Sequence, residues 1–151
     1  MKDNTPANKS VLVTGSSSGI GKAIAAYLAE RGYTVLAAVR RDSAVEALKS
    51  LNVDSLHPLD LTRQDQIDDI ADSIKKSIQK NDIPSLYAVV NAAGGGSLAP
   101  IELMDVTDFR QELEPGLWGR FHCFKGCSLY YASTMGRFFG LSHRDYSLFH
   151  M

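Results

Sequence analysis

Short apolar segments alternate with amphipathic helical segments along most of this chain, and this alternation restricts the fold more than any other feature. The apolar segments are rich in β-branched residues and have no polar face, which is typical of parallel strands that are buried on both sides. Right-handed crossover helices between such strands produce a doubly wound α/β sheet, here with the predicted strand order 3-2-1-4. The predicted strands are residues 10–14, 34–39, 53–57 and 86–90, and the predicted helices are residues 20–31, 42–51, 62–80 and 107–114.

A glycine-rich stretch follows the first predicted strand and leads into the first predicted helix. Glycines permit a tight turn and a close approach of a phosphate group, and the helix N-terminus presents free N–H groups to an anion. Ligands of doubly wound sheets also bind at the carboxyl ends of the strands. The stretch therefore predicts a phosphate-binding loop, the alternative being a turn without a ligand. Its residues are Gly15, Ser16, Ser17, Ser18, Gly19, Ile20 and Gly21.

Two kinds of phosphate-binding loop compete for this stretch. A P-loop requires the pattern G-x-x-x-x-G-K-[ST]. Counted back from Lys22, the first glycine position holds Ser16, and Ala23 stands where serine or threonine is required. The stretch therefore favours a dinucleotide-binding loop, with the spacing G-x-x-x-G-x-G instead of the more common G-x-G-x-x-G.

Several motifs together resemble the short-chain dehydrogenase/reductase family over roughly residues 10–114. The resemblance implies a Rossmann-like fold, a nicotinamide dinucleotide cofactor, and an adenine contact near Asp60 and Leu61. It also implies an oxidoreductase that interconverts the carbonyl and alcohol groups of a small molecule by hydride transfer. The motifs are Thr-Gly-x-x-x-Gly-Ile-Gly at residues 14–21, Asp60-Leu61-Thr62 after the third strand, Asn91-Ala92-Ala93-Gly94 after the fourth strand, and Asp108-Phe109-Arg110 further on.

The residues after the second predicted strand bear on the choice between NADP and NAD. An acidic residue near this position holds the ribose 2′-hydroxyl of NAD, whereas an arginine accommodates the 2′-phosphate of NADP. The chain has Arg40 and Arg41 here, and Asp42 is placed to cap the following helix. A guanidinium group binds phosphate in a bidentate way. We therefore expect NADP, with NAD as the alternative and a solvated basic pair as the non-functional interpretation.

The family's catalytic side chains are only partly matched. By resemblance they are an asparagine in the fourth helix, a serine after the fifth strand, and the tyrosine and lysine of Tyr-x-x-x-Lys. Gly116 occupies the asparagine position, and the preceding Pro115 should interrupt a helix. The nearest match to the tyrosine motif begins at Tyr130, with Thr134 in the lysine position. Tyr130 is thus the candidate acid/base, although an unassisted phenol with a pKa of about 10 is a poor base at neutral pH.

The composition of the chain changes near residues 115–116. Residues 117–151 contain 9 of the 13 aromatic residues and both cysteines, but 1 of the 17 acidic residues. The sequence predicts a polar N-terminal tail at 1–9, a dinucleotide-binding domain at 10–114, and an atypical tail at 115–151 for which poor order is the expectation. No fifth strand is recognisable, so the edge beside residues 86–90 should be open. We expect a truncated and catalytically incomplete protein.

Three functions stay open: an enzyme with Tyr130 as acid/base, a non-catalytic nucleotide-binding module, and a gene fragment without function. The formal net charge of -1 argues against general nucleic-acid binding. No apolar segment approaches the roughly 20 residues that span a bilayer, and no apolar leader is present, so we expect a cytoplasmic protein that does not bind membranes. His122, Cys123 and Cys127 match no strong zinc pattern, so no metal is expected. A homo-oligomer stays open, because members of the family usually pair through helices.

Overall fold

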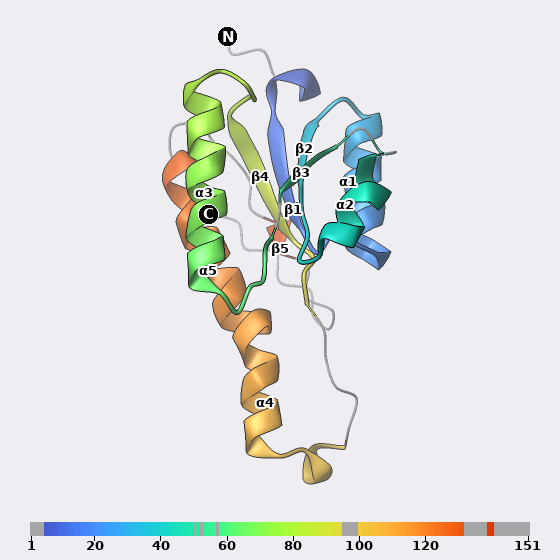
Figure 1. Cartoon of the computed structure of the whole chain (residues 1–151), viewed down its shortest axis with the longest axis vertical. Helices are drawn as coiled ribbons and strands as arrows, with labels where there is room; N and C mark the ends of the chain where they lie inside the picture. Colours follow the sequence, from blue (N-terminus) through green and yellow to red (C-terminus); the bar gives the residue numbers. More distant parts are fainter. Residues whose placement is uncertain are drawn as a thin grey trace.

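In the computed structural model, a parallel sheet forms the centre of the molecule and helices cover both of its faces (Figure 1). The structure describes residues 5–49, 51, 53–56, 58–94, 100–131 and 139–140. The strands are β1 (Ser10–Thr14), β2 (Thr34–Ala38), β3 (Asp54–Leu56), β4 (Leu86–Asn91) and β5 (Phe139–Gly140). The helices are η1 (Pro6–Asn8), α1 (Gly19–Glu30), α2 (Asp42–Lys49), α3 (Gln64–Gln79), η2 (Ile101–Leu103), α4 (Val106–Leu113), η3 (Glu114–Trp118) and α5 (Gly119–Tyr131).

The strand order is β3-β2-β1-β4-β5, which confirms the predicted order 3-2-1-4 for the first strands. Leu12 of β1 lies opposite Leu36 of β2 and Val89 of β4. The prediction of an open edge beside β4 is wrong, because β5 pairs there in parallel and sets Phe139 opposite Val90. A strand of two residues is too short to show the alternation by which a strand is recognised, so β5 could not be predicted from the sequence pattern.

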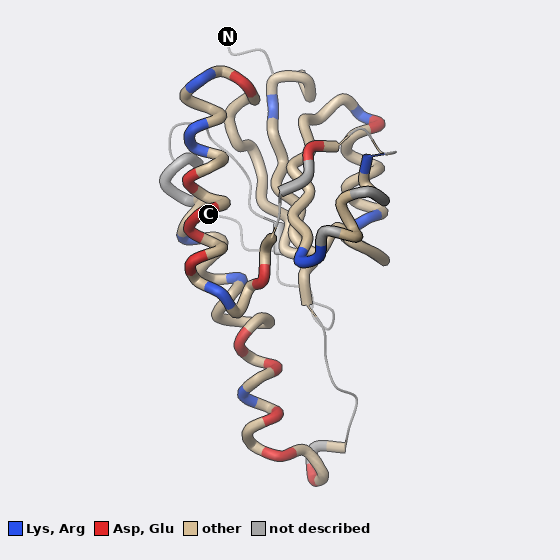
Figure 2. Tube along the Cα trace, viewed as in Figure 1, with Lys and Arg blue, Asp and Glu red and all other residues tan. Residues whose placement is uncertain are grey.

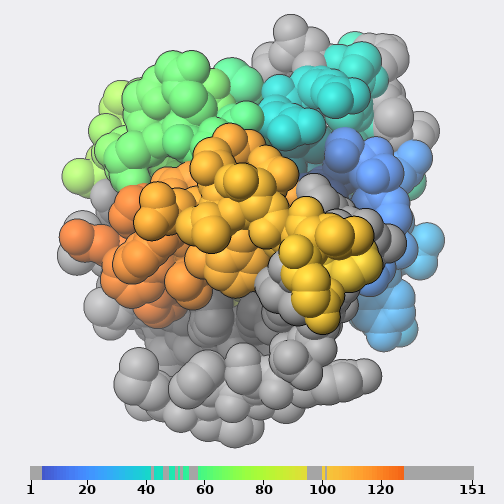
Figure 3. All heavy atoms as spheres, turned by 90° about the horizontal axis from the view of Figure 1, so that it is seen from below, coloured from blue at the N-terminus to red at the C-terminus, as the bar shows by residue number. Residues whose placement is uncertain are grey.

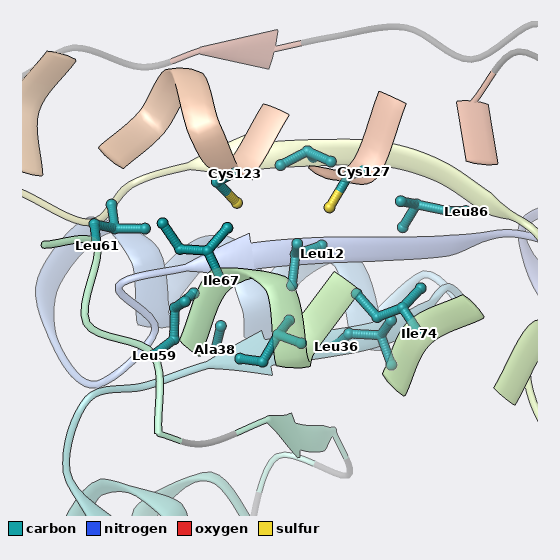
Figure 4. Close-up of a cluster of buried hydrophobic side chains, with 12 residues drawn as sticks. Leu12, Leu36, Ala38, Leu59, Leu61, Ile67, Ile74, Leu86, Cys123 and Cys127 are labelled. Atoms are coloured by element: carbon teal, nitrogen blue, oxygen red, sulfur yellow. The ribbon is translucent and has the colours of Figure 1, made fainter. Parts of the chain in front are cut away.

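The strands lack a polar face because helices cover the sheet on both sides. Figure 1 shows α1 and α2 on one side, and α3 and α5 on the other. All five residues of β1 are buried, with successive side chains on opposite faces. Leu12 lies in a core cluster with Ile67 and Ile74 of α3 (Figure 4), and Val13 lies in a second cluster with Ala25 of α1.

The chain continues in helical form from α4 through η3 into α5. Pro115 lies at the start of η3, a π-helical stretch in which the Gly119 N–H donates to the Glu114 carbonyl five residues earlier. This change of hydrogen-bond register accommodates a residue that has no N–H donor. Pro115 thus does interrupt the α-helical hydrogen bonding, since α4 ends at Leu113, but the expectation that it would break the helical path is wrong.

Helix α5 packs against α3 and β4 and brings Cys123 and Cys127 into the core, each with an exposed fraction of 2% (Figure 4). Glycines permit this close packing: a Cβ on Gly119 would lie 2.6 Å from the Leu61 Cβ, and Gly126 faces α3. The boundary predicted at residue 114 thus does not separate α5 from the sheet. Residues 132–138 and 141–151 lie outside the described residues, and the poor order predicted there stays a prediction.

The Cys123 and Cys127 thiols are free and lie within the apolar core. Within the described part of the chain, no three histidine, cysteine, aspartate or glutamate side chains are grouped so that they could hold a metal ion. Among the described helices, none has both the length and the apolar character needed to cross a bilayer.

Candidate dinucleotide-binding site

The turn between β1 and α1 requires glycine at two positions, because one has a left-handed backbone and both lie against neighbouring backbone. Gly15 has φ +68°, and a Cβ there would lie 2.5 Å from both the Cα and the N of Ala93. A Cβ on Gly21 would collide with the Gly15 carbonyl oxygen, so the first turn of α1 lies directly on the loop. Real Cβ atoms do not approach other atoms this closely, so backbone packing leaves no room for a side chain at either position.

The three serines of the loop have different environments. Ser16 is fully buried, and its hydroxyl donates to the Val13 carbonyl at 2.7 Å while its N–H donates to the Ala38 carbonyl at 3.3 Å. Ser16 therefore holds the loop onto the sheet. Ser17 and Ser18 are exposed, and the Ser18 side chain makes no capping hydrogen bond at the start of α1. The N–H groups of the first helical turn, which includes the exposed Ile20, are thus available to an anion.

An open cleft of about 420 Å³ lies beside this turn. It joins the start of α1 to the end of β2 and the start of α2, where Figure 2 shows a basic stretch. The structure thus brings the predicted arginine pair together with the predicted phosphate loop. The lining residues are Ser17, Ser18, Arg40, Arg41, Ser43 and Ala44. Ser43 and Ala44 are not predicted as site residues from the sequence, although their place at the start of a helix directly after the arginines is a usable signal.

Asp60 lies at the carboxyl end of the sheet near Arg40. Its carboxylate accepts hydrogen bonds from the Thr62 N–H at 3.0 Å and from the Thr62 hydroxyl at 2.8 Å. Burial acts to raise the pKa of Asp60, but these hydrogen bonds and the charges of Arg40 and Arg63 hold it below its ordinary value. Its neighbour Leu61 is buried in the core beside Gly119, so its side chain takes no part in the cleft.

Segment 91–94 begins with the last residue of β4 and lies against the glycine loop. Asn91 is 1% exposed, and among the described residues its Oδ1 has no hydrogen-bond partner. The Ala93 N–H donates to the Thr14 hydroxyl at 3.2 Å. On the other side, Arg120 of α5 donates from Nε and Nη2 to the Ala93 carbonyl, a contact between residues far apart in the sequence that no motif indicated. Ala92 lies against Gly21, and Gly94 is exposed.

The structure does not bring Tyr130 together with these residues. The backbone of Tyr130 lies in the last turn of α5, ten residues after Arg120, and its side chain lies outside the described residues. A helix rises 1.5 Å per residue, so about 15 Å of helix separates the two positions. The catalytic role of Tyr130 stays a prediction that draws no support from the described geometry, and Thr134 lies outside the described residues.

The glycine loop, the basic cleft and segment 91–94 all lie at the carboxyl ends of parallel strands. That is where doubly wound sheets bind dinucleotides, so the fold and the site define a dinucleotide-binding α/β protein. A family model described as short chain dehydrogenase matches residues 9–137, and the chain belongs to this family. The match continues through α5, beyond the last of the sequence motifs.

Individual relatives agree with this assignment. The chain is 36% identical over 112 residues to short-chain dehydrogenase PC-15 of Penicillium crustosum, and 37% identical over 116 residues to 3-amino-tetrahydro-pyrrolizinone reductase of Xenorhabdus hominickii. Both matches cover 74% of this chain, but it spans only 40% and 37% of those relatives' own lengths. A solved alcohol dehydrogenase from the archaeon Thermococcus sibiricus, complexed with 5-hydroxy-NADP, matches with a TM-score of 0.74 and 25% identity, covering 87% of this chain and 57% of that one.

Proposed function

We propose that this chain binds NADP(H) in the cleft beside the glycine loop and forms the cofactor-binding part of an oxidoreductase. Residues 15–21 hold the pyrophosphate at the N-terminus of α1, and Arg40 with Arg41 holds the 2′-phosphate. One observation carries the proposal: a single cleft is lined both by loop residues Ser17 and Ser18 and by this arginine pair. When bound, the nicotinamide supplies hydride to a carbonyl or accepts it from an alcohol.

The residues at the site fit such a cofactor. The lack of a Cβ at Gly15 and Gly21 lets the first turn of α1 lie close on the loop whose residues Ser17 and Ser18 line the cleft. The uncapped start of α1 leaves these groups for a diphosphate. Asn91 Oδ1, which has no hydrogen-bond partner among the described residues, is a buried acceptor at the same carboxyl end of the sheet.

The preference for NADP rests on charge. Arg40 and Arg41 are both exposed at the cleft, and guanidinium groups bind phosphate more strongly than they bind a neutral hydroxyl. The carboxylate of Asp60 is engaged by Thr62, which limits its competition for Arg40. The 5-hydroxy-NADP in the Thermococcus sibiricus enzyme supports the same cofactor, and NAD is the alternative.

The reaction class is inferred from the family alone. Carbonyl and alcohol interconversion on a small molecule is the activity that we propose for the whole protein. The catalytic role of Tyr130, an incomplete catalytic centre, a cytoplasmic location and a homo-oligomer stay predictions from the sequence. Carbonyl-dependent NADPH oxidation that is lost in Tyr130→Phe would favour the enzyme, and binding without turnover would favour the nucleotide-binding module.

Calorimetric titration of NADPH and NADH into the purified chain tests the proposed cofactor. We expect tighter binding of NADPH, and we expect Arg40→Glu to weaken NADPH binding by at least about tenfold while NADH binding changes by less than about twofold, since a carboxylate repels the 2′-phosphate. Arg110→Glu is the matched control, because Arg110 is an exposed arginine on α4. Failure of a folded chain to bind either dinucleotide would refute the proposal.

A further inference from the structure

Arg120 makes an unusual contact at the carboxyl end of β4. It lies in the first turn of α5 and is half-buried, and its Nε and Nη2 both donate to the Ala93 carbonyl, at 3.3 Å and 3.0 Å. Burial lowers the pKa of Arg120, and within the described part of the chain no carboxylate contributes to this shift. One edge of the guanidinium is therefore committed to a single backbone carbonyl 27 residues earlier in the chain.

Ala93 is in turn fixed to the glycine loop. Its N–H donates to the Thr14 hydroxyl at 3.2 Å, and Thr14 is the last residue of β1. A Cβ on Gly15 would lie 2.5 Å from the Ala93 Cα, so the two backbones are in direct contact. Segment 92–94 is thus held between α5 on one side and the β1–α1 turn on the other.

Because Gly94 has no side chain, the Arg120 guanidinium can lie directly against it. A Cβ on Gly94 would lie 2.7 Å from the Arg120 Nη2, which is closer than real Cβ atoms approach other atoms. The colliding atom is the end of a flexible side chain, so the guanidinium would have to move and give up its hydrogen bonds to Ala93. Gly94→Ala therefore disturbs the same contact as a change of Arg120 itself.

We propose that Arg120 is a positioning residue of the dinucleotide site, which holds the Ala93 carbonyl and thereby keeps segment 92–94 pressed against Gly15. The proposal rests on the proposed function, because it assigns Arg120 an effect on the affinity for NADP(H). Arg120 acts through Ala93, and it is not one of the residues that line the cleft. Helix α5 thereby becomes a support for a loop that lies more than 90 residues earlier in the chain.

Arg120→Met tests this, because methionine keeps an unbranched apolar stem and removes the donors. We expect NADPH affinity to fall about tenfold, as the loss of two charge-assisted hydrogen bonds predicts, and the Ala93 amide to exchange its hydrogen at least about tenfold faster. Gly94→Ala should weaken binding in the normal chain and have no further effect in Arg120→Met, because both changes remove one contact. Arg120→Lys, which retains a cation and a donor, should recover part of the affinity.

Arg110→Met is the matched control and should leave affinity and exchange unchanged. Unchanged affinity and exchange in Arg120→Met would overturn the proposal, as would additive effects of Gly94→Ala and Arg120→Met. A lower Tm together with normal NADPH affinity, measured at a temperature well below the Tm, would show a purely structural role for Arg120 and would also overturn the proposal. If the unsubstituted chain binds no NADPH, the proposed function fails, and faster Ala93 exchange would still show that Arg120 fixes the segment. If Arg120→Met does not fold, Gly94→Ala and Arg120→Lys provide the same comparison.

Discussion

The β1–α1 turn and the α4–η3 segment lie toward the same end of the molecule but are built in opposite ways. In the turn, Gly15 and Gly21 meet neighbouring backbone so closely that neither position has room for a Cβ. In α4 and η3 none of the residues is buried, and Gly116 faces open space. Figure 1 shows α4 extending beyond the sheet at this end of the molecule, and Figure 3 shows the same end seen from below, with α4 at the front. Backbone packing specifies the first region, whereas helix propensity and local hydrogen bonds specify the second.

The side chains of the two regions also differ in polarity. The serines and arginines at the turn line a polar cleft, whereas α4 and η3 carry large apolar side chains in the open, with Val106 64%, Leu117 53% and Trp118 52% exposed. Acidic residues are interspersed along α4, as Figure 2 shows. A chemically specific site thus depends on the close approach of backbone segments, whereas a helix of this length can form with little packing. Substitutions in the β1–α1 turn should therefore change stability and cofactor binding more than substitutions in α4 and η3.

The largest effect is expected at Gly15. Gly15→Ala puts a side chain at φ +68° and against the Ala93 backbone. Left-handed backbone and overpacking together should lower the free energy of unfolding by about 2–4 kcal/mol. NADPH affinity should fall at least about a hundredfold as the loop moves. Calorimetric titration and urea denaturation measure the two effects.

Gly32→Ala separates the two causes. Gly32 has φ +81°, but a Cβ there would meet nothing within 4 Å. Only the backbone cost of about 1 kcal/mol should remain, and NADPH binding should not change. Equal losses of free energy of unfolding in Gly15→Ala and Gly32→Ala would show that packing against Ala93 does not contribute to stability. The claim that backbone packing distinguishes the turn from α4 and η3 would then be wrong.

The same contrast explains how far the sequence could predict this protein. The strand order and the glycine loop follow from local patterns: β-branched segments such as β1, and the Gly15–Gly21 spacing. The burial of α5 could not be predicted from large apolar residues, because its inner face is formed by small ones, Gly119, Cys123, Gly126 and Cys127. These residues recur at helical spacing, which is a signal that a search for large apolar residues overlooks. The contact from Arg120 to Ala93 depends on tertiary structure alone, and no local pattern predicts it.

An intermediate effect is expected where η3 joins α5. A Cβ on Gly119 would collide with the Leu61 carbonyl oxygen and lie 2.6 Å from the Leu61 Cβ. Gly119→Ala should therefore lower the free energy of unfolding by about 1–3 kcal/mol through overpacking. Gly116→Ala, three residues earlier and in open space, should raise it by up to about 1 kcal/mol through helix propensity. If urea denaturation gives changes of opposite sign for the two variants, the border between the exposed helix and the closely packed part of the chain lies between Gly116 and Gly119. Equal destabilisation by both variants would contradict such a border.

The smallest effect is expected at Trp118, the last residue of η3. Its side chain is 52% exposed, whereas the Ile74 side chain of α3 is 2% exposed. Trp118→Ser should change the free energy of unfolding by less than about 0.5 kcal/mol, as is usual for a surface position. Ile74→Ala, the buried control, should lower it by about 2–5 kcal/mol. A loss at Trp118 that approaches the loss at Ile74 would mean that this part of the chain is covered in solution, and that packing as well as local helix formation determines the structure of α4 and η3.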